Sequence, residues 1–149
     1  MRKSTSNRRR YPADPMAMFK TLNKIQPFTP EEQAKLTIPA RLCFEKLRTG
    51  VGQENDFHLL AACINVTMIL SEKIDPLAVK VAIDARDACM RLWHRFNRTG
   101  LLGFDGPGLQ DIPPALDLHD QLMELLTPLQ VAEAANEVNN RMQAGEILQ

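Results

Sequence analysis

The segment from Phe57 to Leu70 (FHLLAACINVTMIL) is the most apolar stretch of the sequence, and it constrains the fold more than any other feature. Eleven of its fourteen residues are apolar, and the exceptions are His58, Asn65 and Thr67. A helix that is apolar around nearly its whole circumference must be enclosed by other helices or by lipid. Because about 20 apolar residues are needed to span a bilayer, this run is too short for lipid. The sequence therefore predicts that residues 54–73 form the central helix of a soluble bundle.

A recurring pair of residues indicates where the other helices begin. An oxygen-bearing side chain can cap the free N–H groups of a first turn, and a proline after it suits the first helical position, where no N–H is needed. The pair occurs four times, at Asp14-Pro15, Thr29-Pro30, Asp75-Pro76 and Thr127-Pro128. Apolar periodicity then predicts helices over residues 15–24, 30–36, 38–48, 76–98, 112–126 and 128–144. With no convincing strand, we expect an all-α, single-domain bundle of about five to six helices over residues 15–149.

Two segments are expected to interrupt these helices. Pro39 should break or bend the helix that begins at Pro30, because a proline inside a helix removes a hydrogen bond and clashes with the preceding turn. Residues 99–111 (TGLLGFDGPGLQD) contain four glycines, and this density argues against a regular element before Asp111. A structural loop is the simpler interpretation. The alternative is a partner-binding loop built on an exposed Phe104 and the neighbouring leucines.

Charge is distributed unevenly along the chain. The formal net charge is zero, but residues 1–10 carry five basic residues and no acidic one, so the charge of residues 11–149 is −5. We expect residues 1–14 to form a basic, disordered arm on a mildly acidic body. Such an arm can contact a phosphate backbone or an acidic protein surface. Its candidate contact residues are Arg8, Arg9 and Arg10.

The basic end of the 76–98 helix is a second candidate surface. Four cations gather on one face of its last two turns: Arg91, His94, Arg95 and Arg98. Cations at a helix C-terminus complement the helix dipole, and Asp84 and Asp87 are expected to pair with Arg91 and its neighbours. The functional alternative is an anion site for a phosphate backbone or an acidic partner. On that interpretation, exchanging the three arginines for glutamate should abolish function with little loss of fold.

The three cysteines give no sign of a disulfide framework or a zinc site. Cys43, Cys63 and Cys89 are odd in number, widely spaced, and surrounded by apolar helical neighbours. This pattern indicates buried thiols in a reducing compartment. We expect neither a bound metal nor a cofactor.

The histidines offer only weak candidates for catalysis. His119 projects to the apolar side of its helix, and we expect it to be a core histidine bonded to a backbone carbonyl. His58, Asn65 and Glu72 recur at a seven-residue spacing and so form one strip on the central helix. That strip either faces solvent or forms a buried polar network that must be satisfied internally. An enzyme that uses His119 or His58 is kept as a third class of function.

The order of these features resembles that of short all-helical open reading frames carried by phages and plasmids of bacteria. The resemblance rests on a basic leader, the stretch TPEEQAKLTIPARLCFEKLRTG, an apolar helix and an amphipathic helix that begins with Asp-Pro. It implies a small accessory protein that binds host or mobile-element machinery as a regulator or inhibitor. Inhibition of a host defence system falls within that class. The resemblance carries over no site residue.

The leading expectation is thus a non-enzymatic, cytoplasmic protein that acts by binding a protein partner. The N-terminus lacks the apolar run of a secretory signal, and no transmembrane run follows, so we expect no membrane contact. The alternative is a nucleic-acid-binding protein, with the arm and the basic end of the 76–98 helix on phosphates. A steep loss of affinity with salt would indicate phosphate contacts. Wide apolar faces and the odd cysteine count leave room for a homodimer.

Overall fold

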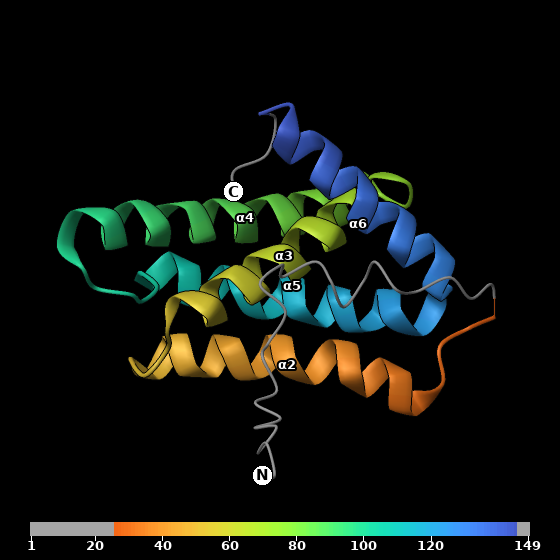
Figure 1. The fold of residues 1–149 in the computed structure, drawn as a ribbon, viewed down its shortest axis with the longest axis horizontal. Coiled ribbons are helices and arrows are strands. Elements are labelled where there is room, and N and C mark those ends of the chain that lie inside the picture. Colours follow the sequence, from red (N-terminus) through yellow and green to blue (C-terminus); the bar gives the residue numbers. More distant parts are fainter. Residues whose placement is uncertain (1–25, 146–149) are drawn as a thin grey trace, which may run out of the picture.

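The computed structural model describes residues 26–145, and all of the regular structure in this range is helical (Figure 1). The helices are α2 (Pro30–Thr49), α3 (Glu54–Glu72), α4 (Pro76–Thr99), α5 (Gly106–Leu125) and α6 (Pro128–Gln143). None of them is long and apolar enough to cross a membrane. The prediction of an all-α bundle is confirmed. The pair at Asp14-Pro15 and the arm residues Arg8, Arg9 and Arg10 lie outside the described residues.

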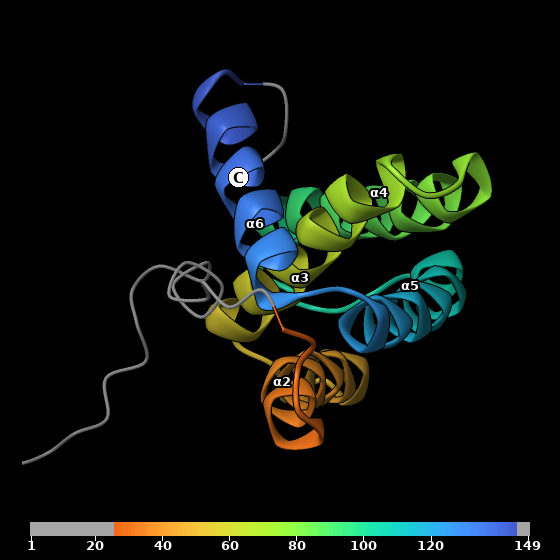
Figure 2. The ribbon, with the colours of Figure 1, turned by 90° about the vertical axis from the view of Figure 1, so that its right-hand side faces the viewer.

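Helix α3 is the central element, as predicted. It packs against each of the other four helices, with α4 and α6 above it and α2 below it in Figure 2. Every residue from Ala62 to Ser71 is buried, so nearly three turns are enclosed on all sides. The two hydroxyls in this stretch bond to the helix itself, since Thr67 donates to the Cys63 carbonyl at 2.8 Å and Ser71 to the Thr67 carbonyl at 2.6 Å. These bonds remove most of the cost of burying a hydroxyl.

The three described residue pairs of the cap-and-proline kind all begin a helix. The side chains of Thr29, Asp75 and Thr127 each accept a hydrogen bond from a first-turn backbone N–H, at 3.2, 2.9 and 3.3 Å. A proline occupies the first turn in each case. Caps of this kind contribute about 1 kcal/mol each. These local signals explain why α2, α4 and α6 begin where the sequence predicts.

The expectation that Pro39 breaks the second helix is wrong. Helix α2 continues through Pro39 and ends at Thr49, and Gly50 caps it with a φ of 82° that suits glycine. Leu36 and Ala40 lie on either side of the proline and belong to one buried face that packs against α3 and α5. An interior proline costs about 3 kcal/mol. Packing of the continuous face outweighs that local penalty, because tertiary contacts contribute most of a helix's stability.

The start of α5 also differs from the prediction. The helix begins at Gly106, not after Asp111, and it contains Pro113 and Pro114. The Asp105 carboxylate caps it by accepting a hydrogen bond from the Gly108 N–H at 2.7 Å. Because Asp-Gly-Pro has a glycine between the cap and the proline, it does not share the adjacent-pair pattern of the other helix starts. Glycine and proline are both tolerated in the first turn of a capped helix.

The three cysteines are free and buried, as predicted. Burial raises the pKa of the thiols of Cys43, Cys63 and Cys89 to about 12. A thiol with so high a pKa is protonated at neutral pH and is a poor nucleophile and metal ligand. The cysteines therefore act as small apolar residues of the core.

The turn between α2 and α3 leads to a testable prediction at Gly52. A Cβ at this position would lie 2.6 Å from Leu47 Cδ2 and 3.0 Å from Leu47 Cα, and Leu47 is only 1% exposed. We expect Gly52→Ala to destabilise the fold by about 1–3 kcal/mol, because the buried leucine and its backbone must move. Urea denaturation measures the effect. Gly106→Ala is the matched control, since nothing lies within 4 Å of its Cβ position. Equal stability of the two variants would contradict the close approach at Gly52.

Candidate interaction surface

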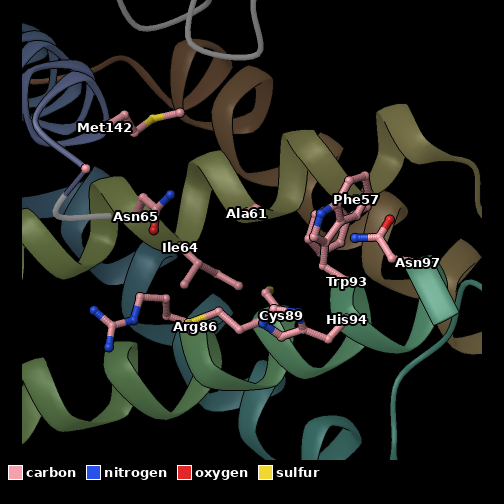
Figure 3. Close-up of a pocket in the computed structure, with 12 residues that line it drawn as sticks. Phe57, Ala61, Ile64, Asn65, Arg86, Cys89, Trp93, His94, Asn97 and Met142 are labelled. Atoms are coloured by element: carbon pink, nitrogen blue, oxygen red, sulfur yellow. The ribbon is translucent and has the colours of Figure 1, made fainter. Parts of the chain in front are cut away.

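A pocket of about 430 Å³ lies between α3 and α4, next to the C-terminal end of α6 (Figure 3). Its middle is apolar, with Ala61 and Ile64 from α3 and Cys89 from α4. The two ends differ in chemistry. Phe57, Trp93 and Asn97 lie at one end, and Asn65, Arg86 and Met142 lie at the other.

The aromatic end is a preformed wall. The rings of Phe57 and Trp93 stack with centroids 5.0 Å apart and planes 13° from parallel. His58 and Phe96 lie against the same indole, at 5.2 and 5.5 Å. Aromatic side chains held in this way offer a large apolar surface that needs little further ordering. Trp93 is also the single tryptophan of the chain.

At the polar end, some hydrogen-bonding groups have no partner among residues 26–145. Asn65 is 7% exposed, lines the pocket, and has no side-chain hydrogen bond to any residue between 26 and 145. The Nε of Arg86 is buried without a partner, and its other nitrogens reach only Met68 Sδ at 3.7 Å and the adjacent Asp87 at 3.2 Å. Buried polar groups without partners are costly. A polar group entering this end of the pocket would therefore be stabilised by hydrogen bonds.

The polar strip of His58, Asn65 and Glu72 on α3 neither faces solvent as a unit nor forms one buried polar network. His58 contacts the Trp93 ring, and Asn65 faces the pocket. Glu72 instead accepts two hydrogen bonds from Arg141 of α6, at 2.7 and 2.8 Å. This contact holds the pKa of Glu72 below its ordinary value. The three residues of the strip therefore have three separate environments: an aromatic contact, a pocket and an ion pair.

The basic end of α4 is partly structural. Arg91 donates to Asp105 at 2.9 Å and approaches Asp111 at 4.0 Å, and Arg95 donates to the Gly103 carbonyl. The expected partners are engaged elsewhere, since Asp84 binds Lys80 at 2.8 Å and Asp87 binds Arg86. The expectation that Asp84 and Asp87 pair with Arg91 is therefore wrong. Because Arg91 and Arg95 hold the α4–α5 connection, glutamates there would also damage the fold.

Two cations of that group remain exposed to solvent. His94 lines the pocket, and Arg98 follows it by one helical turn. Neither side chain makes an ion pair with another described residue. These two residues form a basic rim beside the pocket. We use the name α4 site for Asn65, Arg86, Trp93, His94 and Arg98 together.

The expectation that Phe104 is exposed is wrong. Its side chain is 9% exposed and packs on Phe44, with ring centroids 5.8 Å apart. The connection between α4 and α5 folds back onto α2 and buries this ring there. Leu101 in the same connection is 68% exposed. Phe104 is thus a core residue, and only part of the loop faces solvent.

His119 lies in the core, as predicted, but without the expected bond to a backbone carbonyl. It is buried, neither ring nitrogen has a hydrogen-bond partner within the described part of the chain, and its Nδ1 lies 3.8 Å from Asp120 Oδ1. No three His, Cys, Asp or Glu side chains within residues 26–145 lie close enough together to hold a metal ion.

The ion pairs between α2 and α5 predict a pH dependence of stability. Arg41 donates to Asp120 at 2.6 and 2.9 Å and to Asp117 at 2.7 Å. Burial favours the protonated form of Asp120, but His119 and Arg41 outweigh it and hold its pKa below its ordinary value. The stability that this carboxylate contributes is therefore present above about pH 4, the ordinary pKa of Asp, and lost as the pH falls through the lower folded pKa.

Asp120→Asn tests this dependence. We expect the variant to be less stable than the parent chain at pH 7, and the difference to shrink as the pH falls below about 4. Urea denaturation at several pH values measures it. A difference that stays constant over that range would mean that the Asp120 charge contributes nothing.

Comparison with known proteins gives no match to any family, to any curated protein or to any solved structure.

Proposed function

We propose that this chain acts by binding a protein partner through the α4 site. The observation that carries the proposal is the pocket between α3 and α4, which combines a stacked aromatic wall with a buried amide that has no partner among the described residues. Pockets that anchor a few apolar side chains provide most of the affinity at protein interfaces. An apolar side chain of the partner would fill the pocket, and acidic groups would contact His94 and Arg98.

The wider role we propose is that of a non-enzymatic accessory protein in the cytoplasm. Such a protein would regulate or inhibit a host protein machine, and defence systems are among the candidate targets. The resemblance of its features to those of phage and plasmid reading frames supports this role. A homodimer is compatible with it, and Ile38 and Leu42 are exposed large apolar side chains one turn apart on α2.

Nucleic-acid binding is the alternative, and the geometry supports it less. The basic residues among 1–10 and the exposed Arg98 favour it. However, Arg91 and Arg95 are engaged within the chain. A phosphate backbone is bound by several free cations together. On α4, the end of the helix offers only His94 and Arg98 for that purpose.

A pull-down with the full chain as bait tests the proposal. We expect a partner that remains after nuclease treatment. Its capture should be lost with Ala61→Phe, which fills the pocket, and reduced when His94 and Arg98 are both exchanged for glutamate. Lys80→Glu is the matched control, because it reverses an exposed charge on α4 outside the site, and it should bind normally.

Two results would contradict the proposal. Equal capture by the parent chain and by Ala61→Phe would show that the pocket is not used. Loss of all partners after nuclease would favour the nucleic-acid alternative. Circular dichroism of each variant confirms that the helices are retained.

A further inference from the structure

One face of α2 has no neighbour among the other described helices. Helix α2 lies at the edge of the bundle, below α3 in Figure 2, and its buried side packs against α3 and α5. Its opposite side includes two large apolar side chains, Ile38 and Leu42, which are 54% and 55% exposed. Six exposed residues form this face, which we call the α2 seam: Glu31, Lys35, Ile38, Leu42, Glu45 and Thr49.

The α2 seam has the geometry that a second helix needs. Its residues follow one another at intervals of four, three, four, three and four positions. This alternation is the spacing of the a and d positions of a heptad, where the side chains of two helices interlock. Exposed apolar residues are ordinary when they are scattered singly. Here two of them are adjacent on the face and occupy the middle of the α2 seam.

The charges of the α2 seam indicate that the second helix is another copy of α2. Along the helix the order is acid, base, apolar, apolar, acid. When two copies lie antiparallel and cross at the level of Ala40, Ile38 faces Leu42 of the second copy. Lys35 then faces Glu45 of the second copy, since each lies about 7.5 Å along the axis from that level at 1.5 Å per residue. The two-fold axis makes every contact occur twice. A parallel arrangement in register would instead place like charges on each other.

The charged residues of the α2 seam also have neighbours on their own helix, and these do not block the contact. Lys35 lies 3.6 Å from Glu31, and Glu45 lies 2.7 Å from Arg48. The Lys35 and Glu45 side chains remain 73% and 54% exposed. Exposed pairs of this kind are weak. Each group can therefore keep its neighbour and approach an opposite charge from the second copy.

We propose that this chain forms an antiparallel, two-fold dimer through the α2 seam. Ile38 and Leu42 of both copies form the apolar centre, and the contacts between Lys35 and Glu45 flank it on each side. Because one helix from each copy forms the interface, it is smaller than the standard area of about 800 Å² per partner. We therefore expect a dimer that dissociates on dilution. The α4 site lies on the other side of α3 from α2, so the dimer leaves both pockets open.

Sedimentation equilibrium over a concentration series tests the apolar centre. The parent chain should change from monomer to dimer as the concentration rises. Leu42→Glu should stay monomeric, because it places a carboxylate opposite Ile38. Leu77→Glu is the matched control, since Leu77 is 73% exposed in the first turn of α4, and it should dimerise like the parent chain. A parent chain that is monomeric even at about 1 mM, or a dimer that survives Leu42→Glu, would overturn the proposal.

Mixing two charge variants tests the antiparallel pairing. Lys35→Glu and Glu45→Lys each place two like pairs in the dimer, so each alone should dimerise about tenfold more weakly than the parent chain. In a 1:1 mixture, one chain carries carboxylates at both positions and the other carries ammonium groups at both. Every pair is then opposite in charge, and the mixture should associate at least as tightly as the parent chain. If the mixture associates no better than either variant alone, the antiparallel pairing is wrong.

The dimer and the proposed function are tested separately. Ala61→Phe fills the pocket and should leave the dimer unchanged. Circular dichroism should show the same helix content for every variant. If the parent chain is monomeric and Leu42→Glu abolishes partner capture, the α2 seam binds the partner and not a second copy, which would overturn the dimer.

Discussion

Phe104→Ala is expected to destabilise the fold by about 3–5 kcal/mol, the range for truncating a buried phenylalanine. The side chain is 9% exposed and packs against Phe44 of α2. Removing the ring leaves a cavity between α2 and the connection from α4 to α5. That connection is otherwise held by Arg91 and Arg95, whose bonds reach Asp105 and Gly103. These polar contacts fix the backbone but cannot fill the space.

Leu101→Ala provides the matched control for this prediction. Leu101 belongs to the same connection and is exposed, so its truncation should change stability by no more than about 0.5 kcal/mol. Urea denaturation of both variants measures the difference. If Phe104→Ala were as stable as Leu101→Ala while partner binding was lost, Phe104 would be a surface contact and its packing on Phe44 would be wrong.

The helix starts that could be predicted are those with a local chemical cause. Thr29, Asp75 and Thr127 each cap the helix that follows, and a cap acts within one turn of the chain. The prediction failed at Pro39 for the opposite reason. There the local rule predicts a break, but the buried face that joins Leu36 to Ala40 is held by α3 and α5. The pattern of one sequence does not show that α3 and α5 pack against this face of α2.

The same limit explains the basic end of α4. Side chains three or four residues apart on one helix are neighbours, and this spacing predicts that Asp84 and Asp87 pair with Arg91 and its neighbours. Asp105 competes successfully because the following connection turns back and brings its carboxylate to 2.9 Å from Arg91 Nε. Phe104 of the same connection is buried against Phe44 of α2. Arg91 and Arg95, which the sequence places on a solvent-facing basic surface, therefore form intramolecular contacts that hold the α4–α5 connection.

The pocket itself could not be predicted, although its residues had visible patterns. Phe57 and Trp93 each fall on the apolar side of a predicted helix, which ordinarily indicates core. The seven-residue spacing places Asn65 in a polar strip with His58 and Glu72. What the sequence does not contain is the spacing between α3 and α4, which leaves about 430 Å³ unfilled beside these residues. A site made by the approach of two helices requires their relative placement.

Leu60→Ala is expected to destabilise the fold by about 2–5 kcal/mol, a large part of the 5–15 kcal/mol typical of a domain. Leu60 is fully buried in α3, and α3 contacts each of the other four helices. A helix that moved inward to fill the cavity would therefore lose its packing against its other neighbours. Leu59→Ala is the control on the same helix, because Leu59 is only partly buried. Urea denaturation should show the larger loss for Leu60. Hydrogen exchange should show the amides of residues 62–71 opening only with global unfolding, because this part of α3 is enclosed and has no local route to solvent. Equal losses for the two variants would mean that α3 is not enclosed on the Leu60 side, and the central place of this helix in the bundle would be wrong.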